Sequence, residues 1–169
     1  MRGAAVLFVT LYLLRALVAE LNTALSGFHL WVFAGGLFVT YAALAMPFRS
    51  GFAASVLGGF LCDAMTPVAF GTHALLFGIA HVVVFNVRER LQREETGVRV
   101  IVALLVNLGL YLIISFTRIR HGYGNPATWP RMAADLTWSE AVIALVAPWF
   151  FALQLRMLEM ARANPQRSA

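Results

Sequence analysis

Asp63 is the residue of this sequence best suited to chemistry, because its carboxylate stands inside an otherwise apolar run, residues 51–67. A charge is costly to place in apolar surroundings, so this side chain is expected to face protein or water. Three interpretations are open: an ion pair or hydrogen-bonded polar cluster, a side chain that reaches the outer interface near a break at Pro67, and a ligand or proton site.

Arg15 and His73 are the predicted partners of Asp63 in a polar cluster. Arg15 lies about as far into the first apolar run as Asp63 lies into the third. With a rise of about 1.5 Å per residue, two helices that run the same way would bring both charges to one depth. His73 and His81 fall on roughly one helical face. A lone histidine in an apolar run is best interpreted as a hydrogen-bonded packing residue. The same interpretation applies to Asn107 in the fifth run.

Motifs that would indicate catalysis are absent from the sequence. It contains no H-E-x-x-H, no G-x-S-x-G and no multi-aspartate metal motif. One carboxylate and scattered histidines do not form an acid–base pair, and they offer too few ligands for a metal ion. The sequence therefore predicts a protein that is not an enzyme and that has neither a metal nor another cofactor.

Small residues recur through the third apolar run. Four positions follow one another at i+4 steps: Gly51, Ser55, Gly59 and Asp63. On a helix they form one stripe, and small side chains there let a second backbone approach closely. Ala74 and Gly78 repeat the pattern in the fourth run, which predicts an internal helix-packing seam. Gly36 lies off this stripe and is expected to tolerate a larger side chain better than Gly59.

Composition identifies the elements that must position these residues. The chain has 169 residues, of which 60% are hydrophobic and 12% charged, and a mean hydropathy of +0.76. A soluble domain of this length has too little polar surface to cover so much apolar material. Apolar runs of about 17–23 residues match helices that cross a bilayer, where the backbone must satisfy its own hydrogen bonds. We expect an all-α membrane protein with one domain, residues 1–169.

Six transmembrane helices, joined by short loops, are predicted to form one bundle. Their spans are residues 3–22, 29–46, 51–67, 71–87, 98–116 and 138–158. With both termini in the cytoplasm, nine arginines fall in inside segments and three in outside segments, which favours this orientation. Arginines in short loops also explain the basic pI of about 10.3 as a topology signal, so no nucleic-acid partner is predicted.

Two loops carry further signals. The fourth helix is expected to continue past the membrane and to end at Gly97. Its charges form two i,i+4 pairs of opposite sign: Glu89 with Arg93, and Arg90 with Glu94. This segment is either a solvated helix end or a docking surface for a cytoplasmic partner. Residues 121–130 are rich in Gly and Pro and predict an irregular loop at the outer interface, or an outward partner-binding element.

The segment from residue 47 to residue 74 resembles the core pattern of the MreD family, the rod shape-determining membrane proteins of bacteria. The match is a proline-led turn, a glycine-rich third span, an aspartate, and a Phe-Gly pair followed by a small residue. These positions are Pro47, Gly51, Gly58, Gly59, Asp63, Phe70, Gly71 and Ala74. Chain length, span count and the arginine-rich loop after the fourth span agree as well. Arg15 is not part of the family pattern.

The resemblance implies a non-catalytic subunit of the cell-elongation complex in the bacterial inner membrane. Such a subunit binds MreC, a protein with a single membrane span, and helps to organise or regulate peptidoglycan synthesis. MreC links it to RodA, to the penicillin-binding transpeptidase partner of RodA and to the MreB cytoskeleton. The predicted architecture is also similar to the substrate-binding subunits of energy-coupling-factor transporters, which makes a vitamin-binding transporter subunit the alternative function.

Overall fold

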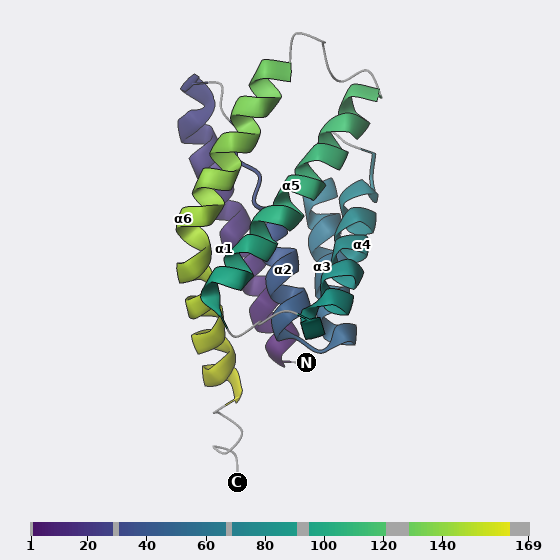
Figure 1. Ribbon diagram of the computed structural model, residues 1–169, viewed down its shortest axis with the longest axis vertical. Coiled ribbons are helices and arrows are strands. Elements are labelled where there is room, and N and C mark those ends of the chain that lie inside the picture. Colours follow the sequence, from purple (N-terminus) through teal and green to yellow (C-terminus); the bar gives the residue numbers. More distant parts are fainter. Residues whose placement is uncertain (1, 29–30, 67–68, 91–94, 121–128, 163–169) are drawn as a thin grey trace.

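The computed structural model describes residues 2–28, 31–66, 69–90, 95–120 and 129–162, with some helical side chains, Arg15 among them, outside that description. Regular structure in these residues is entirely helical, which confirms the predicted all-α class. The six α-helices are α1 (Arg2–Leu25), α2 (Gly35–Ala45), α3 (Phe48–Asp63), α4 (Thr72–Val87), α5 (Thr96–Arg120) and α6 (Trp129–Arg162) (Figure 1). Short 3-10 turns follow α1 at Ser26–Phe28 and α4 at Arg88–Arg90.

Helix α2 is the centre of the bundle. Each of its residues from Gly36 to Leu44 is buried, and the helix contacts α3, α4, α5 and α6. A helix that is apolar on all sides is stable only when other elements surround it. Phe77 of α4 and Phe151 of α6 complete a core around Phe38 of α2, and none of these three rings is exposed by more than 2%.

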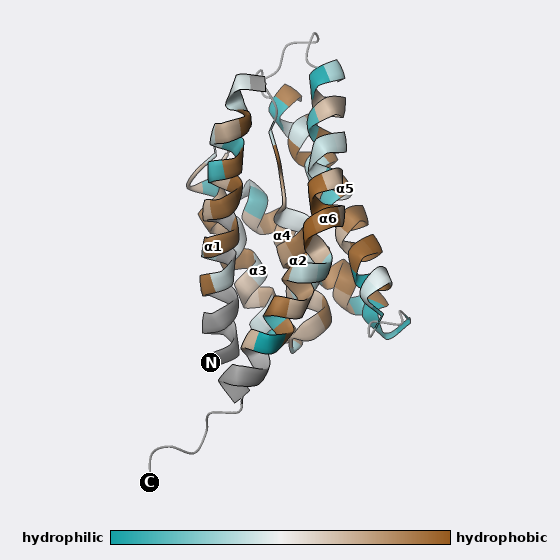
Figure 2. Ribbon diagram, turned by 90° about the vertical axis from the view of Figure 1, so that its left-hand side faces the viewer, coloured by the Kyte–Doolittle hydropathy of each residue, from teal (hydrophilic) through white to brown (hydrophobic). Residues whose placement is uncertain are grey.

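The helices fall into a long set and a short set. Helices α5 and α6 have 25 and 34 residues, whereas α3 and α4 have 16 each. We call the end of the bundle where α2 ends and α3 begins the lower end. From there α3 and α4 rise together, and they stop well below the upper ends of α1, α5 and α6 in both views (Figures 1 and 2).

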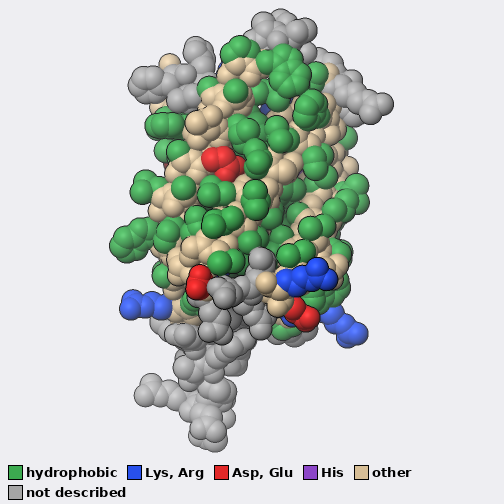
Figure 3. Space-filling model, in the orientation of Figure 1, with side chains coloured by type: hydrophobic (Ala, Val, Ile, Leu, Met, Phe, Trp, Pro, Cys, Tyr) green, Lys and Arg blue, Asp and Glu red, His purple; other side chains and the backbone are tan. Residues whose placement is uncertain are grey.

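The outer surface of the bundle is apolar. Among the described residues, α5 and α6 are the two helices long and apolar enough to cross a membrane, whereas α2 is apolar but has only 11 residues. Leu105, Leu145 and Trp149 are each more than 60% exposed. Hydrophobic side chains cover most of the face drawn in Figure 3, and the arginines visible there gather toward its lower end.

Several helix ends differ from the predicted spans. The second span was expected from residue 29, but residues 31–34 are not helical and α2 begins at Gly35. Gly97 does not end the fourth helix, because α4 ends at Val87 and Gly97 lies in the first turn of α5. The two predicted charge pairs of that loop include residues 93 and 94, which lie outside the described residues.

The upper end of α6 also corrects an expectation. Trp129 and Pro130 were placed in an irregular loop, yet they form the first turn of α6. Proline is accepted in a first helical turn because that turn has no earlier carbonyl to bond. The remainder of the predicted loop, residues 121–128, lies outside the described residues.

Glycines set the closest approaches between helices. A Cβ atom built on Gly59 would lie 2.3 Å from the Cα atom of Ala74, so α3 and α4 touch through their backbones. A Cβ on Gly51 would lie 2.5 Å from the carbonyl oxygen of Ala42, which brings α3 against α2 as well. At Gly78 the contact is ordinary, 3.4 Å to the ring of Phe52.

Gly36 marks a second close crossing, between α2 and α5. A Cβ atom on Gly36 would lie 2.4 Å from the backbone nitrogen of Asn107. The expectation that Gly36 tolerates a large side chain is therefore wrong. Gly109, two residues further along α5, has no atom within 4 Å of its added Cβ and is the open position.

Candidate functional site

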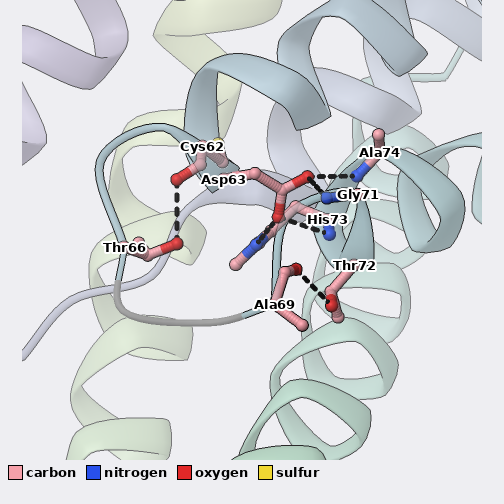
Figure 4. A network of polar contacts seen from close by, with 8 residues as sticks. All are labelled: Cys62, Asp63, Thr66, Ala69, Gly71, Thr72, His73 and Ala74. Carbon is pink, nitrogen blue, oxygen red and sulfur yellow. Dashed lines mark hydrogen bonds and ion pairs between the residues drawn. The ribbon is translucent and has the colours of Figure 1, made fainter.

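The carboxylate of Asp63 joins the end of α3 to the start of α4 (Figure 4). Its Oδ2 atom accepts hydrogen bonds from the backbone N–H groups of Gly71 at 3.0 Å and Ala74 at 3.2 Å. Its Oδ1 atom accepts from the backbone N–H of His73 at 2.9 Å and lies 2.8 Å from Nδ1 of the same residue. Asp63 thus occupies the N-terminus of α4, where free N–H groups and the helix dipole favour a negative charge.

Local sequence makes this arrangement possible. Gly71 has a φ of 96°, a left-handed conformation that glycine adopts without a steric penalty, and it turns the chain into α4. The contact between Gly59 and Ala74 holds the two helices close enough for the short aspartate side chain to span them. The seam and the carboxylate are therefore parts of one hairpin.

Asp63 and His73 are buried, with exposures of 4% and 2%. The ring of His73 lies among aromatic neighbours, 6.5 Å from Phe33 and 6.2 Å from Phe77 between ring centroids. A carboxylate that accepts from three backbone N–H groups and lies beside a histidine ring nitrogen is held in place and has little capacity left for a mobile ligand. The side chain of Arg15 lies outside the described residues, so its predicted pairing with Asp63 stays a prediction.

A second polar contact crosses the seam nearer the lower end. Ser55 Oγ lies 3.1 Å from His81 Nδ1, and both residues are fully buried. The rings of Phe48, Phe52 and Phe85 surround the imidazole at centroid distances of 5.8 to 6.0 Å. His81 Nε2 is buried without a hydrogen-bond partner among the described residues. The contact joins α3 to α4 within an aromatic environment.

Arg88 closes the lower end of α2. Its Nη1 atom donates to the carbonyl oxygens of Met46 at 3.1 Å and Ala43 at 3.4 Å. Its guanidinium carbon lies 3.5 Å from the centre of the Phe85 ring. A cation at the carbonyl end of a helix is favoured by the helix dipole, and the ring adds a cation–π contact.

The extended segment, residues 31–34, runs between the helices at the upper end of α2, and side chains from α1 and α6 hold its backbone. Asn22 forms two hydrogen bonds with Val32, accepting from its N–H at 2.7 Å and donating to its C=O at 3.0 Å. Asp135 accepts from the N–H of Trp31 at 2.9 Å, and Ser139 accepts from the N–H of Phe33 at 3.0 Å. These groups replace the hydrogen bonds that a longer α2 would have made internally.

Asn107 continues this network into the first turn of α2. Its Oδ1 atom accepts from the N–H of Gly36 at 3.1 Å, and its Nδ2 atom donates to Glu140 Oε1 at 3.1 Å. Asn107 is fully buried, whereas Glu140 is partly exposed. One amide therefore ties α2, α5 and α6 together, in agreement with the role expected for Asn107.

Sequence reasoning singled out Asp63, His73 and Asn107 but missed the residues that hold the extended segment. Asp135 and Ser139 lie at i and i+4, which places both on one face of α6. That spacing of polar residues at the start of an apolar helix was the available signal. Asn22 gave no comparable signal, because a polar residue at a helix end is ordinarily solvated.

Within the described residues, no three His, Cys, Asp or Glu side chains converge in a way that could hold a metal ion. The described polar clusters share one property: most of their hydrogen bonds go to backbone groups at helix ends and in the extended segment. No protein-family model, curated protein or solved structure matches this chain.

Proposed function

We propose that this chain is a non-catalytic, six-helix subunit of the bacterial cell-elongation complex, embedded in the inner membrane and bound to an MreC-like single-span protein. In this role it helps to organise peptidoglycan synthesis, and it reaches RodA, its transpeptidase partner and MreB indirectly. The resemblance to the MreD family through Asp63, Phe70 and Gly71 motivates the proposal. The structure adds that the matching residues form one continuous unit, the α3–α4 hairpin.

The observation that carries the non-catalytic role is the use of the buried polar groups. The Asp63 carboxylate is taken up by three backbone N–H groups and His73. The side chains of Asn22, Ser139 and Asn107 likewise accept hydrogen bonds from backbone N–H groups, in the extended segment and at the start of α2. Groups committed to backbone hydrogen bonds stabilise a fixed shape, and a fixed shape is what a scaffold offers to its partners.

Membrane insertion is supported by composition and by the two candidate spans, α5 and α6. Large apolar side chains stand exposed along both helices, and water would be a poor solvent for such a surface. Arg49, Arg88 and Arg99 lie beside the helix ends at the lower end of the bundle, which we assign to the cytoplasm.

Depletion in a rod-shaped bacterium that depends on this chain tests the proposal. Depleted cells are expected to become round and wide, and expression of the wild-type chain is expected to restore rods. A tagged chain should also co-purify with a co-expressed MreC-like protein, and an unrelated single-span protein serves as the control. Normal rods after complete depletion would refute the proposal. Tight vitamin binding in calorimetry would favour the transporter alternative.

A further inference from the structure

We propose that the α3–α4 hairpin ends inside the bilayer, with its upper turn in the outer leaflet against lipid acyl chains. The upper turn is defined here by the described residues 64–66 and 69–71. This inference rests on the membrane insertion proposed above, because it concerns the depth of one element in that membrane. It assigns a lipid-contacting surface to a connection that a six-span topology would place in water.

Helix length supports this depth. Helices α3 and α4 have 16 residues each, which at about 1.5 Å per residue gives roughly 24 Å. The hydrocarbon core of a bilayer is about 30 Å thick. The hairpin starts at the lower end beside Arg49 and Arg88, so it stops short of the opposite interface. Helices α1, α5 and α6 continue past it in both views (Figures 1 and 2).

Several backbone groups in and beside the upper turn are hydrogen-bonded within the hairpin. Asp63 accepts from three N–H groups at the start of α4, and the N–H of Thr72 donates to the carbonyl of Ala69 at 3.1 Å. The hydroxyls of Thr66 and Thr72 donate to backbone carbonyls, one at the end of α3 and one in the turn (Figure 4). Thr66 Oγ1 donates to Cys62 O at 2.8 Å, and Thr72 Oγ1 donates to Ala69 O at 2.7 Å. Each hydrogen bond supplied by the protein lowers the cost of placing non-helical backbone at membrane depth.

The exposed side chains of the upper turn are apolar. Phe70 is 73% exposed and Met65 is 62% exposed, and the Phe70 ring stacks on Phe60 with centroids 5.5 Å apart. Residues 64–71 contain no charged side chain, and Asp63 beside them is buried. Connections in water are ordinarily polar, so this composition fits acyl chains as the contacting partner.

Single cysteines carrying a nitroxide label can measure this depth in vesicles that hold the full chain. The background is Cys62→Ala, and the test position is the exposed Ala69→Cys. Gly27→Cys at the upper end and Gly97→Cys at the lower end are matched controls, because neither has an atom within 4 Å of its added Cβ. Each label is probed with oxygen, which concentrates in lipid, and with a water-soluble nickel chelate.

The label at residue 69 is expected to collide several-fold more with oxygen than with the nickel chelate, whereas the labels at residues 27 and 97 favour the chelate. Chelate accessibility at residue 69 equal to that at residue 27 would overturn the inference and leave membrane insertion intact. A chain that does not float with the vesicles would overturn membrane insertion itself. Phe70→Arg should also lower the amount of chain in the membrane several-fold, whereas Gly27→Arg should not.

Discussion

At the scale of single residues, the buried polar groups act as substitutes for backbone hydrogen bonds. Asp63 caps α4 from the end of α3, and Asn107 supplies the acceptor for the first turn of α2. The sequence predicted that Asp63 would be buried and near His73, because a carboxylate in an apolar run needs partners. It could not predict the backbone donors of Gly71 and Ala74, since every residue carries such groups and only the fold selects them.

Asp63→Ala is expected to lower the thermal stability of the protein in detergent. It leaves three backbone N–H groups and the His73 ring without their acceptor, and each buried unsatisfied group costs about 1–3 kcal/mol. His73→Ala should cost less. The double variant should lose clearly less than the sum of the two, because both changes remove one shared contact. Strict additivity would show that the Asp63–His73 contact contributes nothing.

At the scale of elements, the sequence predicted six helices near their observed places, because apolar runs of this length are strong signals. The end of each helix was less predictable. Residues 31–34 are as apolar as α2, yet they are not helical, and Asn22, Asp135 and Ser139 supply their hydrogen bonds. Hydropathy registers the apolar side chains but not the distant polar residues that change the backbone conformation. Gly97 likewise has the residue type of a helix end, although it lies in the first turn of α5.

Gly59→Leu is expected to separate α3 from α4 and to destabilise the protein by about 3 kcal/mol, a typical upper value for overpacking. Even a Cβ atom there would lie 2.3 Å from Ala74, which is backbone and cannot rotate away. Gly109→Leu is the matched control, a helical glycine with open space around it. Thermal melts in one detergent should place Gly109→Leu near the wild type. Equal melting temperatures for the two variants would refute the close packing of α3 against α4 at Gly59.

At the scale of the whole molecule, the bundle is a buried central helix with apolar surfaces on all outer helices. Arginines near the ends of the apolar runs predict an orientation, which stays a prediction. Arg49, Arg88 and Arg99 lie beside helix ends at the lower end, and Arg118, Arg120 and Arg131 lie beside helix ends at the upper end. Composition cannot give the length of each helix. The structure supplies those lengths, which separate a long set from a short set.

Fusions to the end of the chain test the orientation. A fluorescent protein that matures only in the cytoplasm should fluoresce there, whereas a phosphatase active only outside should be inactive. The phosphatase inserted after Gly27, at the upper end of α1, should be active and provides the internal control. Phosphatase activity at the C-terminus would refute the arrangement with both ends inside.

The extended segment also constrains the order in which the parts of the protein can fold. The donors that Asp63 binds lie only 8 to 11 residues away, so a ribosome that has produced α4 has already produced the complete hairpin. The acceptors for Gly36, Trp31 and Phe33 follow 71, 104 and 106 residues later. During translation these N–H groups must remain with water, lipid headgroups or an insertion factor. The hairpin can therefore assemble during synthesis, whereas the centre of the bundle closes only after α6 has been synthesised.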